Sequence, residues 1–532
     1  MSSIDEKSGV APTKTQHTVD GVILDALQPS TTQVSHHFTK HAAEHEQGDI
    51  AMQYVHNAHE GQEIPPEMRR RLAFKSNVYL FLFMGWCYCL QFADKTIVSG
   101  MSVLGLRDDD IGLAMHGEMY SWVGSAFYFG YLVGIIPMVF IMQRFPVAKV
   151  TSICYLAWAI ILTCSAGAQE YPGFVATRVL LGIFESSVTP AFTILTTQWF
   201  PRNQHFSRIC FWFGFNGLGT IMATSVAYGM YIHGADVSGA PWRALVLVFG
   251  LITVLTAVIF YFHVPDTPVQ AWFLNDEERT WQVELIREQN SSAGYGTRVI
   301  KKYQIWEAII DPATWLAGAY IFLSDVPNGA ATNFSTLILQ GMGFESTKQS
   351  LLMTLPGGGT EFVGCFLTSV VSLYVFRNYR GFYMLLSSAA AVLCYCLLAW
   401  GPNYGSQLFG NYASSWFGPI GMIAALSNIG SNCGGYTKKL VTNGIFLLMY
   451  AAGNIVGPQT FKESEAPGYA TGKTSMAATD AAALLMIALL WLLNVFRNWR
   501  RNKKNEKLPD DLENPEFADL TDLENPEFRY AL

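Results

Sequence analysis

The sequence predicts an all-α membrane protein with about twelve transmembrane helices arranged in two six-helix bundles. The 532 residues are 51% hydrophobic and only 14% charged, whereas soluble domains carry about a quarter charged residues. From residue 78 onward, apolar stretches recur, and each is about twenty residues long, enough to cross a hydrocarbon core of about 30 Å. Two groups of six such stretches flank one long polar segment, residues 264–311.

Composition also excludes several classes of function. The net charge of −7 argues against nucleic acid as a partner, because phosphate binding needs a concentrated basic face. All nine cysteines lie in apolar stretches without a CxxC motif, so we interpret them as packing residues. The sequence shows no nucleophile–base pair, phosphate-binding loop or metal frame, and we therefore expect neither an enzyme nor a bound cofactor or metal.

The first segment, residues 1–76, is polar and lacks apolar periodicity. We expect it to be a disordered cytoplasmic tail, and it has no cleavable signal peptide. His37, His41 and His45 have a spacing that could chelate a metal in a helix. No cysteine or carboxylate frame accompanies them, so a solvated polar tail is the preferred interpretation.

The N-terminal bundle is expected within residues 77–263 and the C-terminal bundle within residues 312–497. Pro137, Pro190, Pro356 and Pro419 interrupt spans, and such breaks either line a cavity or only bend a helix. The predicted spans are 78–99, 118–141, 147–168, 172–195, 209–232 and 242–263, then 313–340, 350–375, 382–400, 408–429, 440–461 and 478–497.

Between the bundles, residues 264–311 are expected to form a cytoplasmic loop with one short helix. Asn275 and Glu278 have the spacing of a capping box at the start of that helix. Asp311 and Pro312 have the residue types of an N-cap and first helical position for the seventh span. Residues 498–532 form an acidic tail in which DLENPEF occurs at 511–517 and again at 522–528. We interpret this tail as disordered, with a trafficking or degradation signal as the alternative.

The distribution of Lys and Arg sets the expected orientation. Near the span ends, 23 of these residues lie on the side of the two tails and 5 on the opposite side. The positive-inside rule therefore places both termini and the central loop in the cytoplasm.

Ionisable residues within the spans are the candidate functional residues, because burying them in a membrane is costly. Span 1 carries Asp94 and Lys95, and span 4 carries Arg178 and Glu185 on one helical face. An anion carrier needs a buried cation, and a proton-coupled carrier needs a carboxylate that can be protonated. The alternative is that Asp94 and Arg178 form a structural ion pair and that Lys95 and Glu185 pair likewise or extend toward the membrane surface. Asp325 and Glu361 are weaker candidates.

Several motifs resemble one family of fungal membrane proteins. The chain is similar to permeases of the anion:cation symporter family, in the allantoate permease subfamily of the major facilitator superfamily. The motifs are ADK at 93–95, RVLLGIFES at 178–186, VPDTP at 264–268, SNCGGYTKK at 431–439, GNIVGPQTF at 453–461, EAPGYATG at 465–472 and NPEFRY at 525–530.

The resemblance implies a plasma-membrane symporter that imports a small organic anion, such as allantoate, nicotinate, pantothenate, biotin or a dipeptide, with protons. It implies proton coupling by Asp94 and Glu185 and substrate binding by Lys95 and Arg178. In the mechanism that we expect, protonation of Glu185, with Asp94 as a second candidate, would loosen the bond to Arg178 and let the carrier reorient. Asn432 and Asn454 are weaker candidates for substrate contacts. Two alternatives remain open, a proton-coupled exporter of a secondary metabolite and a nutrient-sensing transceptor.

Overall fold

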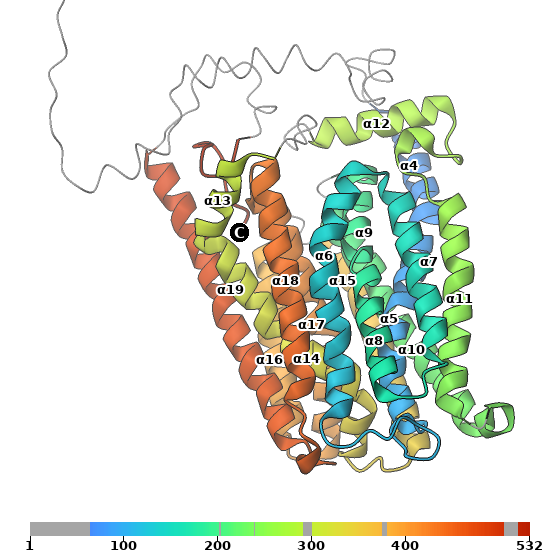
Figure 1. Cartoon of the computed structure of the whole chain (residues 1–532). Helices are drawn as coiled ribbons and strands as arrows, with labels where there is room; N and C mark the ends of the chain where they lie inside the picture. Colours follow the sequence, from blue (N-terminus) through green and yellow to red (C-terminus); the bar gives the residue numbers. More distant parts are fainter. Residues whose placement is uncertain (1–63, 202–203, 239, 291–299, 375–379, 505–519) are drawn as a thin grey trace, which may run out of the picture. The chain divides into compact units, whose positions relative to one another are not determined.

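The computed structural model describes residues 64–201, 204–238, 240–290, 300–374, 380–504 and 520–532. Within these ranges the regular secondary structure is helical and no strand occurs (Figure 1). Eight helices of this part of the chain, with α8 and α9 taken together, are long and apolar enough to cross a membrane. The predicted all-α membrane fold is therefore confirmed.

The N-terminal half begins with two short helical segments that lead into the first span. These are α4 (Pro66–Lys75) and the π-helical η1 (Ser76–Phe81). The spans of this half follow in chain order: α5 (Leu82–Val103), α6 (Met119–Arg144), α7 (Val147–Ser165), α8 (Tyr171–Glu185), α9 (Val188–Trp199), α10 (His205–Ser238) and α11 (Pro241–His263).

The C-terminal half follows a connection that contains the short 3-10 helix η3 (Pro268–Gln270), α12 (Asp276–Asn290) and α13 (Lys302–Ile310). A second 3-10 turn, η4 (Glu463–Glu465), precedes the last helix. The spans of this half are α14 (Pro312–Gln340), α15 (Thr347–Tyr374), α16 (Arg380–Trp400), α17 (Tyr404–Asn432), α18 (Tyr436–Gln459) and α19 (Ala470–Lys504).

All twelve predicted apolar stretches coincide with helices. Four of these helices, α5, α14, α15 and α17, fall outside the eight that meet the length and composition requirement. They carry buried polar residues such as Asp94, Asp325, Glu361 and Asn428. Their polarity therefore belongs to the interior of the protein, where a membrane helix can place such groups without exposing them to lipid.

The fourth span is interrupted in its middle. Helix α8 ends at Glu185 and α9 begins at Val188. Pro190 has no backbone N–H, so the carbonyl of Ser186 loses the helical partner it would otherwise have. The Ser186 and Ser187 hydroxyls turn back to the carbonyls of Ile183 and Phe184, at 2.7 and 2.8 Å. The break places Glu185 at the end of a helix inside the bundle.

Two of the capping contacts predicted in the central segment are confirmed. The Glu278 carboxylate accepts the backbone N–H of Asn275 at 2.9 Å, and Asp311 accepts that of Ala313 at 3.0 Å. Burial opposes ionisation of Glu278, but the hydrogen bond from Lys75, the Asn275 N–H and nearby Arg71 hold its pKa below its ordinary value. Helix α12 is therefore fixed to α4 by charge. The second short helix in this segment, α13, was not predicted.

Within the described residues, part of each expected tail is structured. The expected disordered region extended to residue 76, but Pro66–Lys75 form α4, whose Lys75 pairs with Glu278 at 2.7 Å. The predicted start of the C-terminal tail at residue 498 is also wrong, because α19 continues to Lys504. Residues 1–63, including the histidine group, and 505–519, including the first DLENPEF copy, lie outside the described residues.

The end of the chain packs against the C-terminal half. Asp522 is 1% exposed and its carboxylate lies 2.7 Å from the buried Lys438 Nζ. Tyr530 donates its hydroxyl to Asp522 at 2.7 Å. A buried ion pair thus joins the end of the chain to α18, and this contact between distant parts of the chain is not evident from local composition.

The two halves meet along α10 and α15. A Cβ atom added to Gly217 of α10 would lie 2.2 Å from the Gly358 carbonyl oxygen of α15, so only glycine permits this approach. The halves also touch where Ser99 of α5 and Thr336 of α14 share a 2.8 Å hydrogen bond. Beyond it, Arg107 and Glu463 form a 2.9 Å ion pair.

Candidate functional site

One face of α5 lines an internal cavity of about 150 Å³. Tyr88, Gln91 and Lys95 lie three or four residues apart, the spacing that puts side chains on one side of a helix. Residues of α10 complete the N-terminal side of the cavity, and residues of α14, α15 and α17 supply most of the opposite side. The cavity therefore lies between the two halves of the protein.

The lining is strongly polar. Lys95 is the one cation among the lining residues of the described chain, and two carboxylates, Asp325 and Glu361, share the cavity with it. The remaining hydrogen-bonding groups of the lining are uncharged amides and hydroxyls: Tyr88, Gln91, Thr96, Asn216, Thr220, Ser324, Asn328, Thr332, Ser335, Thr354, Tyr395, Asn411, Ser414, Ser415 and Tyr450.

Lys95 is held by a fully buried carboxylate. Its Nζ lies 3.0 Å from Glu185 Oε1, and the side chains are 11% and 0% exposed. Glu185 is not among the cavity-lining residues. The pair thus has an inner member closed off from the cavity and an outer member that faces it. A ligand carboxylate in the cavity could compete with Glu185 for the same ammonium group.

Asp94 and Arg178 form a second pair, and neither lines the cavity. Arg178 Nη1 lies 3.4 Å from Asp94 Oδ1, with side chains 4% and 1% exposed. Trp158 of α7 donates its indole N–H to Asp94 Oδ2 at 2.8 Å. Asp94 therefore ties together three helices of the N-terminal half, α5, α7 and α8.

The structure gives Glu185 the partner of the alternative interpretation, Lys95, and not Arg178 as the expected coupling mechanism required. The carboxylate pairs with Lys95, whereas Arg178 pairs with Asp94. Neighbouring residues on α5 point about 100° apart, and Arg178 and Glu185 lie two turns apart on α8. Each α5 side chain therefore meets a different residue of α8, which sequence spacing alone could not decide.

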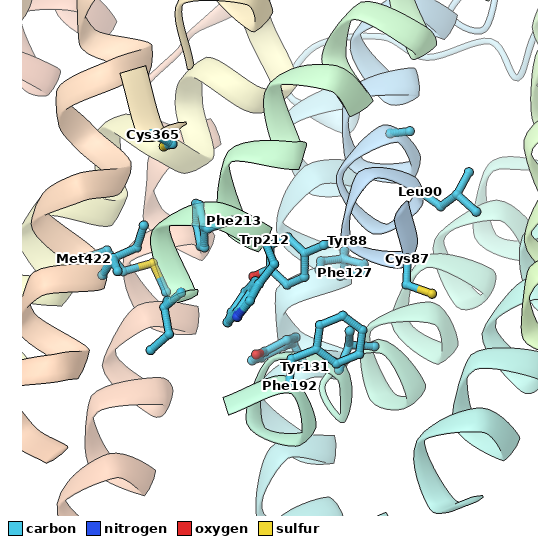
Figure 2. Close-up of a cluster of buried hydrophobic side chains, with 14 of the residues drawn as sticks. Cys87, Tyr88, Leu90, Phe127, Tyr131, Phe192, Trp212, Phe213, Cys365 and Met422 are labelled. Carbon is cyan, nitrogen blue, oxygen red and sulfur yellow. The ribbon is translucent and has the colours of Figure 1, made fainter. Parts of the chain in front are cut away.

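Aromatic side chains surround these charges. Lys95 Nζ and the Arg178 guanidinium lie 5.3 and 5.9 Å from the centre of the Phe127 ring, close enough for cation–π attraction. Figure 2 shows Tyr88, Phe127 and Trp212 among the buried side chains of this region. Tyr88 and Trp212 make an edge-to-face contact at 4.6 Å between ring centres. This packing excludes water from the inner side of the Lys95–Glu185 pair.

Asp325 of α14 is bound by two amides. Asn328 and Asn454 each donate a side-chain N–H to Asp325 Oδ1 at 3.1 Å. Asn454, a predicted substrate contact, is itself fully buried and not among the lining residues. It therefore acts on the cavity through Asp325 and Asn328, which do line it.

Asn432 lies elsewhere. Its side chain accepts the backbone N–H of Ala531 at 2.7 Å and donates to the Ala531 carbonyl at 2.9 Å. It is not a cavity-lining residue. The expectation that Asn432 contacts substrate is therefore not supported by its position, since the end of the chain occupies its hydrogen-bonding groups.

Glu361, a weaker candidate by sequence, lies at the cavity. It is 6% exposed and lines the cavity from α15, and in the part of the chain that the structure describes no Lys or Arg lies within ion-pair distance of it. Helix α15 continues through the run Gly357-Gly358-Gly359 that precedes Glu361. Glu361 follows Gly358 by three residues, and Gly358 is the glycine at which α15 approaches α10 closely. This spacing from a glycine was the one sign in the sequence that Glu361 faces the other half of the protein.

The placement of the His, Cys, Asp and Glu side chains in the described residues also bears on the question of a metal site. Within the described ranges, no group of three or more His, Cys, Asp and Glu side chains is placed to hold a metal ion. Seven of the nine cysteines are buried, and none forms a disulfide. Their packing role is consistent with this placement.

Comparison with known proteins identifies the family. The model of the Major Facilitator Superfamily matches residues 84–458. The allantoate permease of Saccharomyces cerevisiae is 39% identical over 91% of this chain and 90% of its own length. An uncharacterized transporter of Schizosaccharomyces pombe is 38% identical over 88% of this chain and 91% of its own length.

Solved structures support the same fold. The xylose transporter XylE from E. coli, in a partially occluded inward-open conformation, matches with a TM-score of 0.55, at 14% identity over 77% of this chain and 96% of its own. A bacterial homolog of the human lysosomal transporter Spinster matches with a TM-score of 0.51, at 15% identity over 79% of this chain and 97% of its own. The chain therefore belongs to the Major Facilitator Superfamily and is a membrane-embedded secondary transporter rather than an enzyme.

Proposed function

We propose that this transporter imports a small organic anion together with protons, by alternating access between its two halves. The observation that carries the proposal is the Lys95–Glu185 pair, in which the cation faces the cavity and the carboxylate is sealed behind it. The similarity to the allantoate permease favours a carboxylate substrate. Allantoate, nicotinate, pantothenate, biotin and dipeptides are the candidates.

The pair suggests how proton and substrate are coupled. Protonation of Glu185 removes the charge that neutralises Lys95, and the freed ammonium group then binds the carboxylate of the substrate. Without either partner, Lys95 would be an unpaired charge inside the bundle, which is costly. Proton and anion would therefore load together. In this proposal Asp94 and Arg178 are positioning residues that hold α5 against α8, with Asp94 as the second, weaker candidate for proton coupling.

The proposal includes a topology. The two bundles, approximately residues 77–263 and 312–497, would move against each other in the plasma membrane. The Lys and Arg distribution supports cytoplasmic termini and a cytoplasmic central loop. Fusion of a reporter to each terminus, combined with selective permeabilisation of the plasma membrane, tests this orientation.

Uptake by transport-deficient cells tests the function. Labelled candidates are supplied at acidic and neutral external pH, with and without an uncoupler. We expect one carboxylate to accumulate, faster in acid, and to lose this accumulation when the proton gradient collapses. No uptake of any candidate by protein shown to reach the cell surface would contradict the proposal.

Two further observations would identify the alternatives. Raised intracellular product in a deletion strain would indicate export. Signalling that survives loss of transport, but not removal of residues 1–76, would indicate a sensor.

A further inference from the structure

The side of the cavity formed by α10 and α15 contains a second polar group that the proposed mechanism does not use. Glu361 projects from α15 into the cavity lining, and Asn216 projects from α10. The Asn216 side chain lines the same side of the cavity as the Glu361 carboxyl. Its Oδ1 atom is buried and has no hydrogen-bond partner among the residues that the structure describes.

The helix contact fixes this pair of side chains. Gly217 and Gly358 allow the backbones of α10 and α15 to touch, and a Cβ at either position would lie 2.2 to 2.5 Å from a carbonyl oxygen of the other helix. Asn216 adjoins Gly217, and Glu361 follows Gly358 by three residues, about one helical turn. The two polar groups are therefore held on rigid elements, as a binding site requires.

The two cavity carboxylates differ in their surroundings. Asp325 accepts hydrogen bonds from two asparagine amides, whose other contacts keep them in place. Glu361 has Asn216 beside it and, in the described part of the chain, no ion-pair partner. A carboxyl group has acceptor oxygens whether it is ionised or protonated. A buried acceptor that opens onto a cavity is satisfied by a donor from the ligand.

We propose that Glu361 is a specificity-determining residue that accepts a hydrogen bond from an N–H group of the transported anion, while Lys95 binds its carboxylate. The proposal rests on the proposed function. The negative side of the cavity repels the substrate carboxylate and directs it to Lys95 on the other half. Anions that carry an amide or amino N–H are thereby favoured over anions of the same shape without one.

A matched pair of small anions tests the proposal. Succinamate and levulinate have the same chain and the same carboxylate, but the amide NH₂ of the first is a methyl group in the second. Binding of each to the full chain in lipid nanodiscs is measured by ligand-dependent thermal stabilisation. We expect succinamate to bind the wild-type protein about tenfold more tightly or better, the effect of one hydrogen bond to a charged group.

Glu361→Met removes the acceptor at nearly constant side-chain length. We expect it to abolish the preference for succinamate while levulinate still binds, which also shows that the variant is folded. Glu361→Gln keeps one acceptor oxygen and should retain an intermediate preference. The control is Asp480→Asn, because Asp480 is a buried carboxylate of α19 that does not line the cavity. It should leave the preference unchanged.

Three outcomes would overturn the proposal. They are equal binding of the two anions by the wild-type protein, no binding of either, and an unchanged preference in Glu361→Met. A loss of acid-stimulated uptake that affects all substrates equally in Glu361→Gln would instead assign the residue to proton transfer. Because binding in nanodiscs needs no proton gradient, failure of proton-driven import remains distinguishable from failure of this assignment.

Discussion

Replacing Lys95 and replacing Glu185 should lower the free energy of unfolding by different amounts. At 3.0 Å, two unit charges attract by about 5 kcal/mol at an effective dielectric constant of about 20, and the cost of desolvation offsets most of this attraction. Lys95→Met leaves a fully buried carboxylate without its cation, and we expect it to lower the free energy of unfolding by about 3–5 kcal/mol. Glu185→Gln leaves Lys95 facing a polar cavity, so about 1–3 kcal/mol is expected.

The double variant should be more stable than Lys95→Met alone. It contains no unpaired charge at this position, and we expect a coupling free energy of about 2–3 kcal/mol from the double-mutant cycle. The free energy of unfolding is measured by titration with a denaturing detergent, for the four proteins in the same mixed micelles. Asp94→Asn is the matched control, since it loses the Arg178 pair outside the cavity and should not couple to Glu185→Gln in the same way.

Transport measurements complete this test. Glu185→Gln mimics a permanently protonated carboxyl group, so it should bind substrate but lose accumulation driven by acid outside. Lys95→Met should lose substrate binding. Additive effects of the two substitutions on stability, or full acid-driven accumulation by Glu185→Gln, would refute the reasoning.

Three other regions give predictions of their own. Asp522→Asn removes a partner of the buried Lys438 and should lower the free energy of unfolding by about 1–3 kcal/mol, measured by the same titration; no change would show that the end of the chain is not held by this pair. The pKa of Glu278 is lowered in the folded protein, so its stabilising effect is complete above its unfolded pKa of about 4.3 and is lost as the pH falls through the folded pKa. The protection factors of the α12 amides, which correct for the slower intrinsic exchange in acid, should therefore fall on acidification in the wild-type protein and depend less on pH in Glu278→Gln, and identical pH profiles would contradict this. Gly217→Ala places a methyl group 2.2 Å from the Gly358 carbonyl oxygen and should cost about 1–3 kcal/mol, whereas Gly229→Ala on the same helix, which meets no atom within 4 Å, should be neutral in the same assay.

The sequence alone determined the membrane fold. Hydropathy is a property of consecutive residues, because each span must supply its own apolar length and its own backbone hydrogen bonds. The N-cap at Asp311 and the capping contact of Glu278 were predictable for the same reason, since both depend on residues a few positions apart. The candidate charges at Asp94, Lys95, Arg178 and Glu185 were also visible, because ionisable residues are rare inside apolar stretches.

How these charges act depends on contacts between helices, which the sequence pattern does not show. Which α8 residue meets Lys95 depends on the rotation and crossing of two helices, and the sequence pattern leaves both free. The exposure of Glu361 to the cavity and the burial of Asn454 are set by contacts between α10, α14, α15 and α18. The binding of Asp522 to Lys438 joins positions 84 residues apart. The sequence identifies the polar residues within the membrane spans. Packing between helices determines which of them form pairs and which face the substrate.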